Sequence, residues 1–120
     1  MYFAKTLFVL AALSTSVFGH AGITPGLGVR GKITRNQVQR PSAGRPCGNA
    51  AVAAIDSSTP AQANGGTFAV TATNFNGGQD GSTQFTAQID PTGTGRQFRP
   101  ATVVKNGQLA PRAVGDVQIT

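Results

Sequence analysis

The sequence predicts an all-β protein, an antiparallel β-sandwich that is incomplete at its C-terminal end. Two observations predict the strands. Short, Thr-rich segments alternate apolar and polar residues, and Gly-, Asn- and Asp-rich turns separate them. A third observation excludes helical architectures: the 120 residues contain no glutamate and only 12% are charged, so neither a coiled coil nor an exposed charged helix is expected.

The first nineteen residues have the layout of a secretory signal peptide. Lys5 precedes an apolar run over 7–13, and small residues lead to Gly19. This run is too short to cross a bilayer as a helix, and no later segment is apolar enough to do so. We therefore expect a secreted, extracellular protein with a signal peptide over 1–19, a β-rich domain over 20–120 and no membrane span.

The first part of the predicted domain favours irregular structure. Residues 20–48 are rich in glycine, proline and arginine, which predicts a loop with one short strand over 29–34. Residues 49–55 are mostly alanine. Periodicity over so few residues does not separate a short helix from a strand, so both alternatives stay open there.

Residues 66–75 and 83–90 are predicted to pair as a β-hairpin, with 76–82 as its long Gly-rich loop. Their apolar faces are Phe68, Val70 and Ala72 in the first strand, and Phe85, Ala87 and Ile89 in the second. Alternation of this kind is typical of strands that are buried on one side only.

Two further strands are predicted near the end of the chain. The first covers 98–104, where Pro100 restricts the start of the strand to an edge or a bulge. After a turn at Asn106, the second covers 113–120, with Val117 and Ile119 on one face. The chain stops within this strand, and we expect the sequence to be the N-terminal part of a longer protein.

The predicted domain has a small core and a single cysteine. Leu, Ile, Val and Phe number nineteen in 20–120, just under the level of about 20% at which burial offsets chain entropy. Without Lys5, nine cations and four aspartates leave a modest net charge of +5, which favours a folded chain over a disordered one. Such secreted domains usually need a covalent staple. Cys47 is either a free thiol or bridged outside this sequence, to another chain or beyond Thr120, and we expect a partner outside.

His20 is the most suggestive candidate metal ligand. If cleavage follows Gly19, the α-amine and imidazole of His20 can chelate Cu(II) together. Secreted fungal polysaccharide monooxygenases use this arrangement, with a second histidine completing a three-nitrogen brace. His20 is the only histidine, and no tyrosine follows residue 19 for an axial position. Copper at His20 is therefore an alternative that needs further ligands from outside the sequence.

Other catalytic arrangements are weaker, and we identify no catalytic residue. The carboxylates available as a pair are Asp56, Asp80, Asp90 and Asp116. Each lies in or beside a turn or strand end, where aspartate usually bonds its own backbone. His20 is poorly placed as the base of a triad, and Cys47 has no second histidine to activate it. The loop 76–82 offers one carboxylate where calcium loops use several. We lean against an enzyme.

Residues 30–45 carry five cations and no acid: Arg30, Lys32, Arg35, Arg40 and Arg45. A basic stretch can dock an acidic polysaccharide, a membrane surface or nucleic acid. Arginine also covers backbone and pins loops, and we favour that structural role. A secreted protein seldom meets nucleic acid, so none is expected as a partner. No Trp, and no Tyr after residue 19, is available as the stacking platform of a carbohydrate-binding module.

Several stretches resemble one known family. His20-Ala21-Gly22-Ile23 is similar to the His-Gly-x-Ile start of mature fungal Gas/MAS proteins, also called Egh-like virulence factors, which are secreted and associated with appressoria and host penetration. Residues 40–48 resemble their cysteine-bearing stretch, and 68–81 is the longest match. The resemblance implies a fungal, extracellular, cysteine-stapled β-protein that continues past Thr120. It carries no assigned reaction.

Two functional hypotheses follow. The first is a non-enzymatic, secreted fungal surface or effector-like protein, linked to the appressorium, that contacts cell-wall polysaccharide or the host surface and needs no cofactor. The second is a copper-binding protein resembling polysaccharide monooxygenases and anchored by His20. A second histidine in a longer chain would distinguish them.

Overall fold

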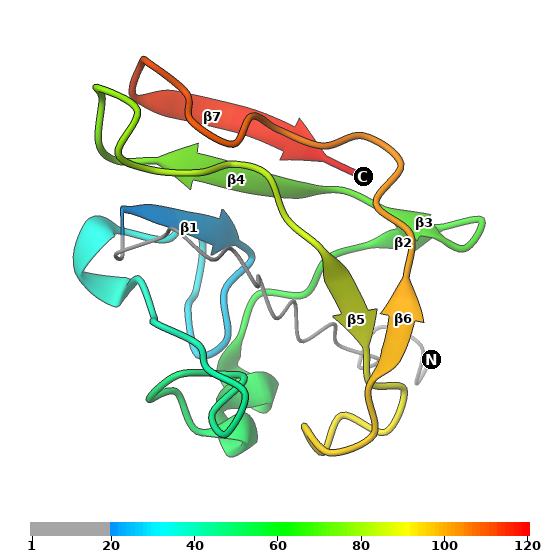
Figure 1. The fold of residues 1–120 in the computed structure, drawn as a ribbon. Coiled ribbons are helices and arrows are strands. Elements are labelled where there is room, and N and C mark those ends of the chain that lie inside the picture. The colour runs from blue at the N-terminus through cyan, green and yellow to red at the C-terminus, as the bar shows by residue number, and fades with distance from the viewer. Residues whose placement is uncertain (1–19) are drawn as a thin grey trace.

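The computed structural model describes residues 20–120 and is an all-β fold whose antiparallel sheets pack together, as the sequence predicts (Figure 1). The predicted signal peptide, 1–19, lies outside the described residues. The strands are β1 (Ala21–Thr24), β2 (Ala63–Asn64), β3 (Thr67–Phe68), β4 (Val70–Asn74), β5 (Ala87–Ile89), β6 (Arg99–Ala101) and β7 (Gly115–Ile119). Two short 3₁₀ helices, η2 (Arg35–Gln37) and η3 (Val52–Ser57), complete the elements. Between residues 20 and 120, no helix is long and apolar enough to cross a membrane.

The main sheet has three antiparallel strands in the order β1-β4-β7, so β4 is its centre. The register aligns Thr24, Thr71 and Gln118 in one row across the sheet, and Gly22, Thr73 and Asp116 in the next row on the same face. Two smaller antiparallel pairs, β2-β3 and β5-β6, complete the sheets. In Figure 1 the strands of β5-β6 run steeply across the direction of β4 and β7.

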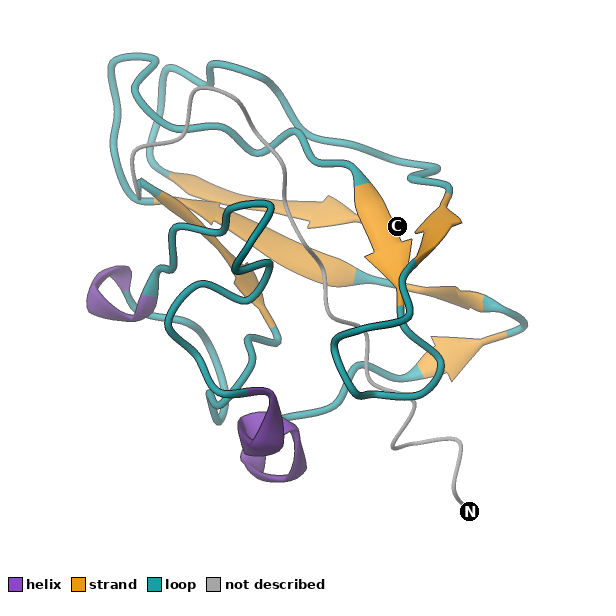
Figure 2. Cartoon of the chain, turned by 60° about the horizontal axis from the view of Figure 1, so that its bottom comes forward, coloured by secondary structure: helices purple, strands orange, loops and turns teal. Residues whose placement is uncertain are grey.

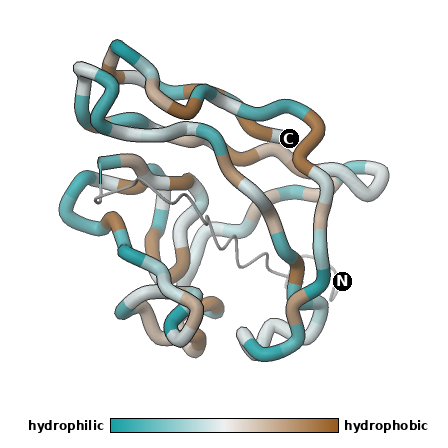
Figure 3. Tube along the Cα trace, in the orientation of Figure 1, coloured by the Kyte–Doolittle hydropathy of each residue, from teal (hydrophilic) through white to brown (hydrophobic). Residues whose placement is uncertain are grey.

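The core lies on the other face of β4. Val70 and Ala72 are buried there with Phe85 and with Ile119 from β7. Four partly buried residues pack against this cluster: Ile23, Phe68, Val103 and Val117. The apolar faces predicted for β4 and β7 are therefore confirmed. Between residues 20 and 120 the hydrophobic residues occur in short stretches with no long run (Figure 3), which agrees with the small core predicted from composition.

The predicted hairpin between 66–75 and 83–90 is wrong. β4 pairs with β1 and β7, whereas β5 pairs with β6. The reason lies at Phe85, whose backbone is occupied by an amide side chain. The Phe85 N–H donates to Asn106 Oδ1 at 3.0 Å, and Asn106 Nδ2 donates to the Phe85 carbonyl at 2.7 Å. Asn106 thus imitates a neighbouring strand, and residues 83–86 form no ladder of their own.

The strand in the first half of the described chain lies at another place than the sequence predicts. Residues 29–34 form bends and irregular structure, while the four residues after His20 form β1, where the sequence predicts a loop. Side-chain hydroxyls take up backbone groups there: the Gly31 N–H donates to Thr59 Oγ1 and the Ile33 N–H donates to Thr24 Oγ1, both at 2.9 Å. The two purple 3₁₀ turns in Figure 2 both belong to this loop-rich part.

Two other sequence expectations have clear outcomes. Of the alternatives for 49–55, the helical one holds, as a 3₁₀ helix shifted to η3. Pro100 lies in β6, one strand of a two-stranded pair, where a residue without an N–H is tolerated because only one edge of the strand is paired.

The core predicts how stability responds to small deletions. We expect Ile119→Val to lower the free energy of unfolding by about 1 kcal/mol, because one buried methylene is lost without full relaxation. The matched control is Val114→Ala, since Val114 is 63% exposed, and its effect should stay within about 0.5 kcal/mol. Urea unfolding followed by circular dichroism measures both. Equal effects would contradict the placement of the core.

Candidate functional site

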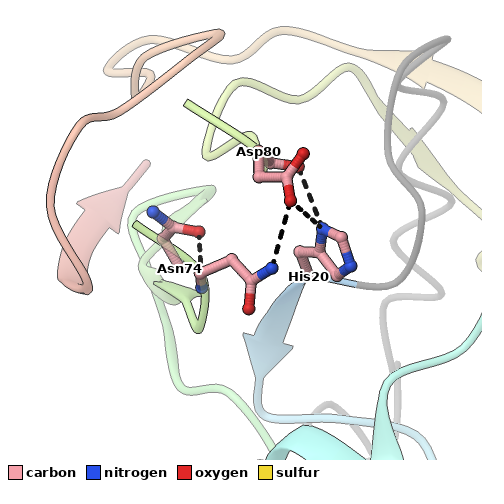
Figure 4. A network of polar contacts seen from close by, with 4 residues as sticks. His20, Asn74 and Asp80 are labelled. Atoms are coloured by element: carbon pink, nitrogen blue, oxygen red, sulfur yellow. Dashed lines mark hydrogen bonds and ion pairs between the residues drawn. The ribbon is translucent and has the colours of Figure 1, made fainter. Parts of the chain in front are cut away.

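His20 lies where the start of β1 meets the turn after β4. Its carbonyl oxygen accepts the Phe75 N–H at 2.8 Å. Its Nδ1 lies 3.1 Å from the carbonyl oxygen of Asp80 and 3.6 Å from Asp80 Oδ2. Figure 4 shows the two contacts between His20 and Asp80, together with the 3.3 Å hydrogen bond that Asn76 Nδ2 donates to the same carboxylate oxygen. The imidazole, the carboxylate and the amide therefore form one polar cluster.

The glycine after Asp80 and the buried Asn74 bring the loop this close. Asn74 is 1% exposed. Its Nδ2 donates to the Ala113 carbonyl at 2.9 Å, and its Oδ1 accepts the Asn76 N–H at 3.2 Å. Gly81 packs against this side chain so closely that a Cβ there would collide with Asn74 Oδ1. The sequence marked 76–82 as a turn-rich loop but held no signal that it would lie beneath His20.

The geometry defines what His20 can do chemically. A carbonyl oxygen only accepts, so Nδ1 is the donor in this contact. Chelation by the amine and the imidazole of the same residue closes a small ring through Nδ1, so copper would have to replace the hydrogen bond to Asp80. The Asp80 carboxylate, with Oδ2 3.6 Å from Nδ1, would then be a neighbouring anionic oxygen donor. Within residues 20–120 no group of three or more His, Cys, Asp or Glu side chains is placed to hold a metal ion.

Asp90 is fully buried, and its role is structural, as predicted for an aspartate beside a turn. Its carboxylate accepts the Thr92 hydroxyl at 2.5 Å and the Thr92 N–H at 2.8 Å. The Arg96 and Gln97 N–H groups donate to the other oxygen at 3.0 and 3.4 Å. These bonds, that of the Thr92 side chain first, outweigh desolvation and hold the pKa of Asp90 well below its ordinary value. The group is therefore ionised and unsuited to act as a general acid.

Asp116 and Asp56 lie elsewhere. Asp116, on β7, accepts Lys32 Nζ at 2.7 Å and Thr73 Oγ1 at 2.7 Å. The bond from Lys32, then that from Thr73, lowers the pKa of Asp116. Asp56 is exposed on η3. Asp80, Asp90 and Asp116 thus belong to three separate hydrogen-bond networks. Asp56 lies on η3.

Cys47 is half-buried beside a cavity of about 130 Å³ between β1 and the loop 25–50. The lining is largely apolar, with Ile23, Val29 and Ile33 among its residues. Burial raises the pKa of the Cys47 thiol. A thiol that stays protonated is a poor nucleophile, so Cys47 is not placed for catalysis.

Of the Lys, Arg and Asp residues in 20–120, only Asp90 is buried. All nine Lys and Arg residues of 20–120 are exposed. The basic segment, defined as residues 30–45, is also fixed to the domain at Gly31 and Ile33 by the bonds to Thr59 and Thr24, and at Lys32 by Asp116. A basic loop tied down in this way presents its charges in a defined place.

Asp90 predicts a pH dependence of stability. Its pKa is lower in the folded than in the unfolded chain, so its contribution is present above the unfolded value of about 3.9 and is lost as the pH falls toward the folded value. We expect Asp90→Asn to be less stable at neutral pH, because an amide N–H₂ would face backbone donors. Urea midpoints at neutral and acidic pH should show the deficit shrinking in acid. A deficit that is independent of pH, or one equal to that of the exposed control Asp56→Asn, would contradict this role.

Comparisons with known proteins add no relative. No protein-family model, curated protein or solved structure matches this chain.

Proposed function

We propose that this chain is a secreted fungal surface protein of the effector type, without a catalytic role, that contacts cell-wall polysaccharide or the host surface. The resemblance to Gas/MAS proteins and the layout of residues 1–19 support an extracellular role linked to the appressorium. A binding function is favoured, since Asp90 and Asp116 serve separate structural networks and Cys47 is not activated.

One observation carries the proposal, namely the excess of exposed cations over exposed acids. All nine cations of 20–120 are exposed, whereas Asp90 is fully buried and the other three aspartates are exposed, one of them, Asp116, in an ion pair with Lys32. A partner therefore meets nine exposed cations against three exposed aspartates, a surface charge of +6 where the net charge of 20–120 is +5. Such a surface attracts polyanions over about a Debye length, 10 Å at 0.1 M salt. Outside the cell, acidic polysaccharides and host surfaces are the polyanions available.

Binding to wall material tests the proposal. The chain is secreted from a fungal host with its own first nineteen residues, its N-terminus is sequenced, and it is mixed with insoluble wall fragments. We expect a start at His20, retention in low salt, and release near about 1 M NaCl, where the Debye length falls to about 3 Å. Arg30→Gln with Arg35→Gln should weaken retention, and the neutral control Gln84→Ala should not. Protein that stays in the supernatant at low salt would refute wall binding.

Copper binding at His20 is the second candidate, favoured by the carboxylate 3.6 Å from Nδ1. Amine, imidazole and carboxylate are nitrogen and oxygen donors of the kind that suits Cu(II) in a tetragonal field. His20 is partly buried, with 22% of its side chain exposed, so an ion there would be partly shielded from solvent.

Electron paramagnetic resonance of the Cu(II)-loaded protein that begins at His20 tests this candidate. We expect a nitrogen-rich axial signal that is lost in His20→Ala and altered in Asp80→Asn, because the carboxylate is the neighbouring oxygen. Asp56→Asn, on η3, is the matched control and should keep the wild-type signal. An unchanged spectrum in His20→Ala would rule out this site.

A further inference from the structure

A groove of about 440 Å³ lies over the polar face of the three-stranded sheet. Its floor includes Thr24, Thr71 and Gln118, which the strand register places side by side across β1, β4 and β7. Its walls are Gly31 and Lys32 on one segment and residues 59–62 on another. Its volume falls within the range of small-ligand sites, about 300–1,000 Å³. The groove is on the face of β4 opposite the core.

The groove offers hydrogen-bonding groups that the described chain does not use. The side chains of Gln62, Thr71 and Gln118 line it and make no hydrogen bond to other groups in residues 20–120. Each amide supplies donors and an acceptor, and the hydroxyl supplies both. Pro25 and Pro60 add flat apolar surface. Sugar rings carry the matching combination, hydroxyls around the edge and C–H groups on the faces.

Charge narrows the class of sugar. Recognition of neutral sugars usually relies on an aromatic platform, and the lining of this groove contains none. Its cation is Lys32, and Arg30 precedes the wall residue Gly31. The Lys32–Asp116 pair is open to solvent, with 59% and 44% of the side chains exposed. Exposed ion pairs contribute little to stability, so a ligand carboxylate can replace Asp116 as the partner of the Lys32 ammonium.

We propose that this groove binds a carboxylate-bearing sugar residue of an acidic polysaccharide. Lys32 contacts the carboxylate, the neighbouring Arg30 adds positive charge beside the groove, and Gln62, Thr71 and Gln118 contact the hydroxyls. The inference rests on the proposed function and names the partner for it. The concave, polar lining favours a polysaccharide over a membrane surface, because apolar side chains that insert among the headgroups add to the membrane affinity of a protein face.

Titration with an oligogalacturonate at low salt, followed by calorimetry, tests the proposal. The probe's fully methyl-esterified form has the same backbone without the charge. We expect the acid form to bind and the ester to bind at least about tenfold more weakly, as loss of a hydrogen bond to a charged group costs about 1.5–3 kcal/mol. Equal binding of the two forms would overturn the proposal.

Variants locate the site. Arg30→Gln should weaken binding about two- to fivefold, the range of an exposed ion pair. Arg112→Gln is the matched control, because it removes the same charge at the other end of the sheet, where the Arg112 carbonyl accepts the Gly78 N–H.

Asp116→Asn should strengthen binding by a similar factor, since it removes the carboxylate that competes for Lys32. A gain of affinity cannot come from misfolding. Equal losses in Arg30→Gln and Arg112→Gln, or no gain in Asp116→Asn, would refute the groove.

The outcomes separate this inference from the proposed function. Retention on wall fragments without binding to oligogalacturonate overturns the groove proposal and leaves the function standing. No retention on walls, with binding to oligogalacturonate, refutes wall contact and supports the groove. Vesicles containing about 30% phosphatidylserine serve as the second polyanion, and binding to them as tight as to the oligosaccharide would overturn recognition of a sugar.

Discussion

The central position of β4 between β1 and β7 is the constraint on which the rest of the structure depends. Because successive side chains of a strand point to opposite faces, β4 separates an apolar face of the sheet from a polar one. Val70 and Ala72 form the core with Phe85 and Ile119, and Thr71 and Thr73 form a polar face with Gln118 and Asp116. A small domain with few large apolar residues gains most by concentrating them on one side of its best-paired strand.

Side-chain hydrogen bonds substitute for regular secondary structure in much of the remaining chain. Asn106 forms hydrogen bonds with both backbone groups of Phe85. Asp90 accepts hydrogen bonds from the loop that follows β5, and Asn74 forms hydrogen bonds that fix the turn beneath His20. Buried polar groups are costly unless they are paired. Asn74, Ser82 and Asp90, the largest fully buried side chains, therefore help to specify loops that hydrophobic packing alone would leave undetermined. The burial of Asp90 also removes one negative charge from the surface, where the cations are exposed.

The two candidate regions lie at different parts of this framework and have different chemistry. The cluster of His20, Asn76 and Asp80 is compact, with the imidazole proton directed at a carbonyl oxygen. The groove over the polar face is open and combines neutral hydrogen-bonding groups with the fixed start of the basic segment. The polar cluster suits a small ion and the groove suits part of a polymer, so the binding function we propose is assigned to the groove.

The sequence by itself determined the fold class, the faces of β4 and β7, the edge position of Pro100 and the turn role of Asp90, because alternation and turn chemistry are local properties. Only the tertiary structure decided which strands pair, since the pairing of β4 with β1 and β7 joins residues far apart in the chain. For the same reason, no local pattern brought Asp80 to His20, Lys32 to Asp116, or Gln62 to Gln118 across the groove. Those contacts depend on long-range packing, and the proposed binding site exists only once that packing has formed.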